Sequence, residues 1–223
     1  MGVLVSFGFK RGRASSCCFY HPERDIRCVV HGDDFAFTGY DEDLNWVQAQ
    51  MESRFLCKVA GRLGPPPAGS ASAATAGGAA ATSELRFLTR VVRWTPAGLK
   101  YEADPRHAEL LLRDLERLEG PTVRASLSTP CLKRTVEAEE EAVPLEKSRV
   151  EAYRGLAARV NYLALDRPDL AFAAKGCCRR MTNPSSLDWS ALVCLARYVA
   201  GRPRLVYDFL GKTRSHRLIE YIE

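Results

Sequence analysis

The side chains with the clearest potential for chemistry are two adjacent aspartates, Asp33 and Asp34. Two short runs of β-forming residues, 28–30 and 35–38, flank them, so this stretch is typical of a strand, a tight turn and a second strand. Neighbouring side chains of a regular strand point to opposite faces. The two carboxylates can therefore approach one site only where the backbone bends, and Gly32 permits such a bend.

Two carboxylates held close together favour a divalent cation. They repel by about 4 kcal/mol at a separation of roughly 4 Å and an effective dielectric near 20, and a bound cation offsets that repulsion. Mg²⁺ (or Mn²⁺) takes oxygen ligands, commonly one or two carboxylates together with substrate phosphates, as in phosphoryl transfer. The alternative is that the pair only closes a hairpin, because aspartate is a common turn residue.

The surroundings of this pair resemble a known catalytic hairpin. A hydrophobic strand, then His31 and Gly-Asp-Asp-Phe, then a second hydrophobic strand and an amphipathic helix are similar to the hairpin of reverse transcriptases, whose usual form is Tyr-x-Asp-Asp. Short phrases elsewhere occur in the order found in reverse transcriptases of copia-type (pseudovirid) LTR retrotransposons. Those phrases are Gly8-Phe9, Phe87-Leu88, Gly98-Leu99-Lys100-Tyr101, Tyr153-Arg154-Gly155-Leu156, Asn161-Tyr162-Leu163, Arg167-Pro168-Asp169-Leu170-Ala171-Phe172 and Ala196-Arg197-Tyr198-Val199-Ala200-Gly201.

The resemblance implies an RNA-directed DNA polymerase by ancestry. Its substrates would be primer-template nucleic acid and deoxynucleoside triphosphates, with Mg²⁺ (or Mn²⁺) held by Asp33 and Asp34, of which Asp33 is the more essential ligand. Lys58 falls near the place where such polymerases often have a lysine beside the incoming triphosphate. The family also uses a third carboxylate and fingers that we expect to lie upstream of this truncated, C-terminal part of the polymerase region. The chain alone is therefore expected to be inactive unless a partner chain supplies the missing palm and fingers.

The implied fold class is α+β, a partial reverse-transcriptase palm with an antiparallel sheet followed by a helical thumb and connection region. We expect five segments along the chain. They are a partial palm with the Asp-Asp hairpin (1–63), a low-complexity flexible insert whose ends remain close (64–83), a palm-base hairpin (84–102), a thumb-like helix with a linker (103–146) and a helical connection region (147–223).

Apolar spacing predicts the helices. One helix is expected over 41–55, with Asp41 or Asp43 capping its start. A second begins with the cap Asp104 before a proline and ends at Gly120, and its apolar stripe includes Leu118. Three more are expected over 148–165, 168–181 and 186–200. Asp169 lies after the catalytic hairpin rather than before it, so we assign it to the start of its helix.

The composition is that of a globular protein, with 46% hydrophobic residues and a net charge of +5. The charge is uneven, since residues 147–223 hold 14 Lys/Arg against 7 Asp/Glu, an excess suited to phosphate contact. No apolar run is long enough for a membrane helix and no secretory pattern is present, so we expect an intracellular protein, cytoplasmic or nuclear, with no membrane partner. The eight cysteines lack the spacing of a zinc site and indicate free thiols.

Two other functions remain open. One is a non-catalytic remnant that binds nucleic acid through its basic surface, which would show salt-dependent affinity that ignores magnesium. The other is an unrelated palm-fold enzyme such as a nucleotide cyclase, whose metal-binding acids also lie on a hairpin. The ordered C-terminal phrases argue against the cyclase.

Overall fold

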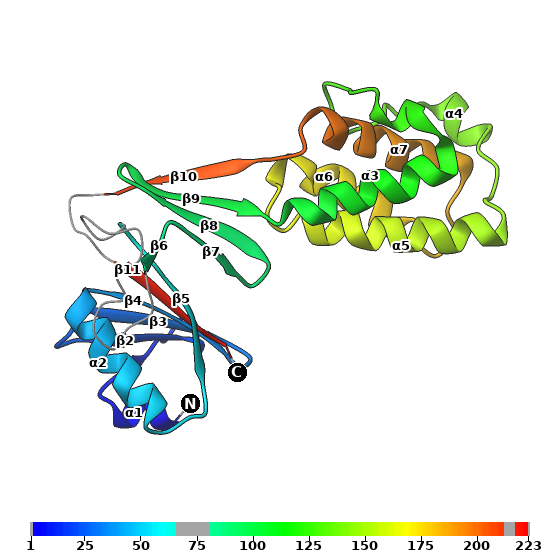
Figure 1. Ribbon diagram of the computed structural model, residues 1–223. Helices are drawn as coiled ribbons and strands as arrows, with labels where there is room; N and C mark the ends of the chain where they lie inside the picture. Colours follow the sequence, from blue (N-terminus) through cyan, green and yellow to red (C-terminus); the bar gives the residue numbers. More distant parts are fainter. Residues whose placement is uncertain (1, 66–80, 212–216, 223) are drawn as a thin grey trace. The chain divides into compact units, whose positions relative to one another are not determined.

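The computed structural model describes residues 2–65, 81–211 and 217–222. The chain forms two compact units, one of residues 1–101 with 208–223 and the other of residues 102–207 (Figure 1). Most of the predicted insert, residues 66–80, lies outside the described residues. The two ends of the predicted insert are close in space, since the amide of Gly64 donates to the carbonyl of Thr82 at 3.2 Å.

The first unit contains a seven-stranded sheet in the order β1-β2-β3-β4-β11-β5-β6. Neighbouring strands run antiparallel except for β5 and β6, which are parallel. Strands β2, β3 and β4 form an antiparallel meander, and the Asp-Asp turn joins its last two strands. The strands are β1 (Lys10–Arg11), β2 (Cys18–His21), β3 (Ile26–His31), β4 (Asp34–Gly39), β5 (Lys58–Leu63), β6 (Ala81–Thr82) and β11 (Arg217–Ile222).

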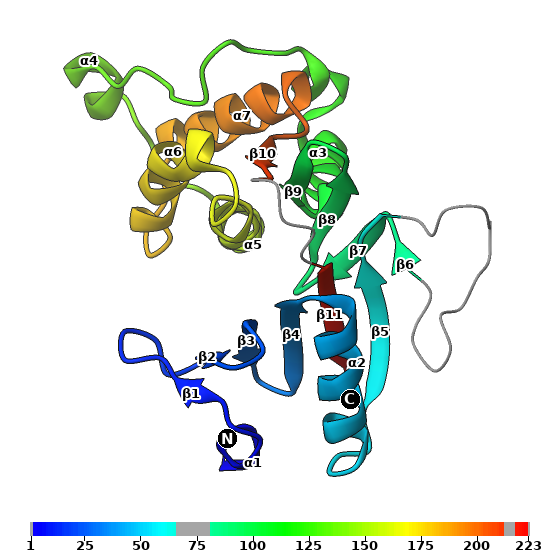
Figure 2. The ribbon, with the colours of Figure 1, turned by 90° about the vertical axis from the view of Figure 1, so that its left-hand side faces the viewer.

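Helix α2 (Asp41–Glu52) packs its apolar stripe against this sheet (Figure 2), and a short helix α1 (Gly2–Ser6) adds Leu4 to the same core. The α2 side chains Leu44, Val47 and Met51 are fully buried, as their spacing predicts. The predicted cap is wrong. Tyr40 occupies the N-cap position without a side-chain hydrogen bond, because the helix already begins at Asp41. Asp41 and Asp43 lie in its first turn, where they pair with Arg62 and Arg24.

A second, four-stranded sheet has the order β10-β9-β8-β7. The predicted hairpin between β8 and β9 is present, but the preceding stretch has a turn of its own at Leu88 and Thr89. Both residues have positive φ, 47° and 65°, as a type I′ turn requires. Neither is the usual glycine or asparagine, so the sequence gives no sign of this turn. The strands are β7 (Glu84–Phe87), β8 (Arg90–Thr95), β9 (Gly98–Ala103) and β10 (Val206–Leu210).

The second unit is helical, with a core built from the inner faces of its longer helices. The predicted start of α3 is confirmed, since Asp104 accepts a hydrogen bond from the amide of Arg106 at 3.0 Å. Leu118 is 47% exposed and so does not belong to the apolar stripe. The helices are α3 (Pro105–Glu119), the 3₁₀ helix η1 (Pro121–Arg124), α4 (Val136–Glu140), α5 (Lys147–Leu163), α6 (Pro168–Arg179) and α7 (Ser186–Gly201).

The predicted helical description of 147–223 is wrong for its last part. Helical structure ends with α7, and two strands, β10 and β11, follow. The last strand, β11, is inserted between β4 and β5 and pairs with both. Strand pairing over this sequence distance leaves no local pattern, which explains why periodicity did not predict it. Of the helices in the described residues, none is long and apolar enough to cross a membrane.

We expect the sheet to depend on the backbone of β11. Ile219 lies opposite Phe37 of β4 and Arg62 of β5, so Ile219→Pro removes an amide from the ladder. Hydrogen exchange of the amides in β4 and β5 should become about tenfold faster or more, while the amides of α5 and α7 keep their rates. Ile219→Ala retains the amide and is the matched control. Unchanged exchange in β4 and β5 of the proline variant would show that β11 is dispensable.

Candidate functional site

The candidate site is the turn between β3 and β4. His31 and Asp34 form the last pair of the ladder, so Gly32 and Asp33 make a two-residue loop. Gly32 has a φ of 61°, the positive value that the first position of a type II′ turn requires. The structure therefore confirms the strand, turn and strand predicted from the sequence, including the role of the glycine.

The carboxylates of this turn are accessible to solvent and have no partner among the described residues. Asp33 is exposed and Asp34 is partly buried. Neither carboxylate makes a hydrogen bond or ion pair with any residue that the structure describes. Below them the hairpin is apolar, with Val30 buried and Phe35 packed 6.0 Å from Phe55, measured between ring centroids. The hairpin thus holds two free carboxylates at its end on a packed base.

The donor set fits the cation predicted from the sequence. Two neighbouring carboxylates without protein partners offer the oxygen ligands that Mg²⁺ or Mn²⁺ takes, with the remaining positions left to water and phosphate. Among the described residues, no group of three or more His, Cys, Asp or Glu side chains is placed to hold a metal ion. The described residues therefore add no third such side chain to Asp33 and Asp34.

Lys58 lies at the same edge of the sheet as the turn. It begins β5 and lies opposite Ile222 of β11, while the neighbouring Tyr221 lies opposite Phe35 of β4. Lys58 is thus two strands away from Asp34, about 10 Å at the usual strand spacing. Its side chain is exposed and has no partner among the described residues. Sequence reasoning named Lys58 but missed β11, the strand that sets this distance.

Asp169, the other acid singled out from the sequence, has a structural role. Both of its carboxylate oxygens accept from the buried Arg167, at 2.9 and 2.7 Å, and Tyr198 donates to it at 3.0 Å. Burial raises the pKa of this carboxyl, but the hydrogen bonds and charge of Arg167 outweigh burial and leave the pKa below its usual value. Arg167 also donates to the carbonyl of Arg202 at 2.9 Å, so the pair joins the start of α6 to the end of α7.

The cysteines supply neither a disulfide nor an activated nucleophile in this site. All eight are free, as expected from their spacing. Cys28 is the one on the hairpin strands, and burial raises its pKa. In the helical unit burial likewise raises the pKa of Cys177 to about 11. These buried thiols remain protonated at neutral pH and pack as small apolar groups.

Comparison with known proteins finds a similarity over part of the chain. A stretch of 51 residues, 23% of this chain, is 41% identical to the retrovirus-related Pol polyprotein from transposon RE2 of Arabidopsis thaliana. The similarity supports a retrotransposon origin. The match spans 4% of that polyprotein, so it covers only a small part of the polyprotein's length. No family model matches the chain. No solved structure matches it either.

Replacing Gly32 tests the backbone of the turn. A Cβ at this position would meet nothing within 4 Å, so the cost of Gly32→Ala comes from the positive φ alone. We expect the free energy of unfolding of the first unit to fall by about 1 kcal/mol, measured by hydrogen exchange in denaturant. Gly155→Ala is the control in α5, where the added methyl is also unobstructed and should raise stability by about 0.5–1 kcal/mol. Equal effects of the two substitutions would contradict the assigned turn.

Asp169→Asn tests the structural role of the Arg167 pair. Arg167 is 1% exposed, so losing the partner charge should lower the free energy of unfolding of the helical unit by about 3 kcal/mol at pH 7. The depressed pKa means that this stabilisation is complete above about pH 4, where free aspartate titrates, and disappears as the pH falls through the lower folded value. Wild type and variant should therefore converge in acid. Asp114→Asn, which breaks a more exposed pair with Arg159, should cost less than about 1 kcal/mol.

Proposed function

We propose that the chain descends from the reverse transcriptase of a copia-type LTR retrotransposon, with the seven-stranded sheet as part of the palm and the helical unit as thumb and connection. The observation that carries the proposal is the exposed Asp33-Asp34 turn, whose carboxylates have no partner among the described residues. The ordered family-like phrases and the similarity to a transposon Pol polyprotein support the same origin.

In this proposal Asp33 and Asp34 bind Mg²⁺ (or Mn²⁺). The metal supplies charge stabilisation for deoxynucleotidyl transfer to a primer 3′ hydroxyl. The chain's own part is to hold the ion with two carboxylates on a rigid hairpin. Lys58, at the same sheet edge, is suited to neutralise the phosphates of an incoming deoxynucleoside triphosphate. The proposed polymerase would act inside the cell, in the cytoplasm or nucleus.

The isolated chain is proposed to lack polymerase activity by itself. The resemblance calls for a third carboxylate and for fingers, both of which a partner chain would supply. A second candidate function is a remnant that binds nucleic acid without chemistry. The observation that favours it is the excess of seven positive charges in residues 147–223, which suits phosphate contact.

Metal binding at the hairpin is tested with Mn²⁺. Titration of the purified chain should broaden the amide signals of the β3–β4 turn selectively, because a bound paramagnetic ion acts over a short range. Asp33→Asn should remove most of that broadening, and Asp34→Asn should weaken it. Glu23→Gln, which changes an acid of the β2–β3 turn at the opposite end of β3, is the control and should leave the broadening unchanged. Equal broadening in wild type and Asp33→Asn would refute the proposed site.

Primer extension, together with primer-template affinity, tests the two candidate functions. On a DNA-primed RNA template with Mg²⁺, we expect no extension by the folded chain alone. Extension that is lost in Asp33→Asn would instead show that the hairpin is active and that the third carboxylate is present. A primer-template affinity that depends on salt but is unchanged by Mg²⁺ would favour the binding remnant.

A further inference from the structure

The helical unit has a basic hollow of about 300 Å³ on one side of α6. Its lining contains four cationic side chains and no acidic one. Several of its members are spaced three or four residues apart along α6 and therefore share one face of that helix. The lining residues are Arg134, Phe172, Lys175, Gly176, Arg179 and Arg180.

Two of the four cations are uncompensated. Lys175 and Arg179 are exposed and make no hydrogen bond or ion pair with a residue that the structure describes. Arg180 has only a long contact with Asp188, 3.9 Å between Nε and Oδ1. The hollow therefore presents positive charge that an anionic ligand can pair with.

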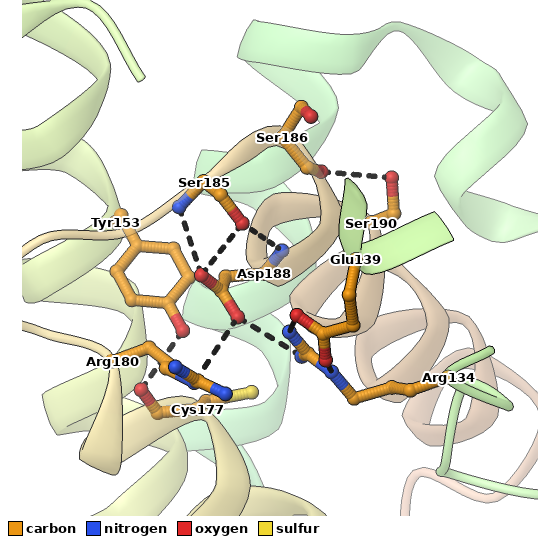
Figure 3. Close-up of polar contacts among 9 residues, drawn as sticks. All are labelled: Arg134, Glu139, Tyr153, Cys177, Arg180, Ser185, Ser186, Asp188 and Ser190. Carbon is orange, nitrogen blue, oxygen red and sulfur yellow. Dashed lines mark hydrogen bonds and ion pairs between the residues drawn. The ribbon is translucent and has the colours of Figure 1, made fainter. Parts of the chain in front are cut away.

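Arg134 forms the fixed wall of the hollow (Figure 3). Its guanidinium donates to Glu139 at 2.6 Å and to the buried Asp188 at 2.9 Å. The pKa of Arg134 is raised, chiefly by the hydrogen bond to Glu139. Asp188 in turn accepts from the amide and hydroxyl of Ser185, both at 2.8 Å, and so completes the capping box of α7. This network holds the wall in place and leaves Lys175 and Arg179 as the adaptable charges.

An aromatic ring completes the hollow. Phe172 is 81% exposed, the most exposed aromatic side chain in the described part of the chain. Gly176, one turn further along α6, has no side chain, and a Cβ built on it would meet nothing within 4 Å. A long side chain at this position would therefore extend into space that is open in the structure.

We propose that this hollow binds single-stranded nucleic acid, with a base stacked on Phe172 and the neighbouring phosphates paired with Lys175 and Arg179. Single-strand binding characteristically combines an exposed aromatic face with a positively charged groove. Inorganic phosphate would use the cations but not the ring. The site is separate from the Asp33-Asp34 hairpin, so it holds whether or not that hairpin binds metal.

The charge part of the site is tested by fluorescence anisotropy with a labelled 12-nucleotide oligothymidylate in EDTA, which excludes any metal at the hairpin. Lys175→Gln with Arg179→Gln should weaken binding about tenfold or more and lower the slope of log affinity against log salt by about 1.4, the value for two lost phosphate contacts. Arg106→Gln with Lys147→Gln removes the same charge from the same unit, at exposed side chains that have no partner among the described residues. That control should change affinity less than about threefold.

The stacking part is tested by Phe172→Ala and Gly176→Leu. The first should lower affinity about tenfold without changing the salt slope, since no charge is lost. The second places a side chain in the open space and should also lower affinity, while Gly155→Leu, at an equally unobstructed helical glycine, should not. Thermal melts establish that each variant is folded.

Four outcomes would overturn the proposal, three of which concern the hollow itself. Those three are no binding of the oligonucleotide by the wild-type chain, wild-type affinity in both Phe172→Ala and Gly176→Leu, and equal competition by polyglutamate, which carries charge without bases. Asp33→Asn measured in the same assay should bind like wild type. A loss of binding there would place the nucleic-acid contact at the hairpin and would likewise contradict the α6 site.

Discussion

The sheet that carries the candidate metal site is completed by backbone pairing with the last strand of the chain. β4 has β3 on one side and β11 on the other, and β11 pairs in turn with β5. Without β11, two strands would each present a row of unpaired amides and carbonyls, which is unfavourable for a central strand. The turn that holds Asp33 and Asp34 is thus anchored by residues nearly two hundred positions away in the sequence, and the same pairing brings Lys58 to its edge.

The local part of this fold follows from the sequence, and the long-range part does not. The Gly32 turn, the stripe of α2 and the Asp104 cap are each determined by residues within one or two turns of one another, and all three were predicted. The pairing of β11 depends on a distant stretch with no periodic signal. The turn at Leu88 and Thr89 was missed for another reason, because those residue types rarely adopt a positive φ and the surrounding strands impose it.

The aspartates of this chain fall into two groups, according to whether their carboxylate oxygens already accept hydrogen bonds from other side chains. Asp169 and Asp188 accept from arginines inside the helical unit, where their charges join helix ends. Asp33 has no such partner among the described residues. A carboxylate without a partner contributes little to folding, and repulsion from its neighbour opposes the folded turn. Asp33 and Asp34 therefore lie side by side on the hairpin with oxygens available to a ligand, which is what the proposed metal site requires.

The same distinction applies to the cations, and it explains why a charge count did not locate a binding surface. Most arginines of the helical unit are paired with acids or backbone carbonyls, as in the contacts of Arg154 with residues 181 and 182 and of Arg159 with Asp114. An excess of positive charge over a long segment therefore says little about where an anion binds. What remains available on α6 is set by helical spacing, which places Lys175 and Arg179 on the face of Phe172, and by the absence of acids there. The spacing is visible in the sequence, but the sequence does not show which cations are already paired, so a charge count could not distinguish this face of α6 from the paired arginines.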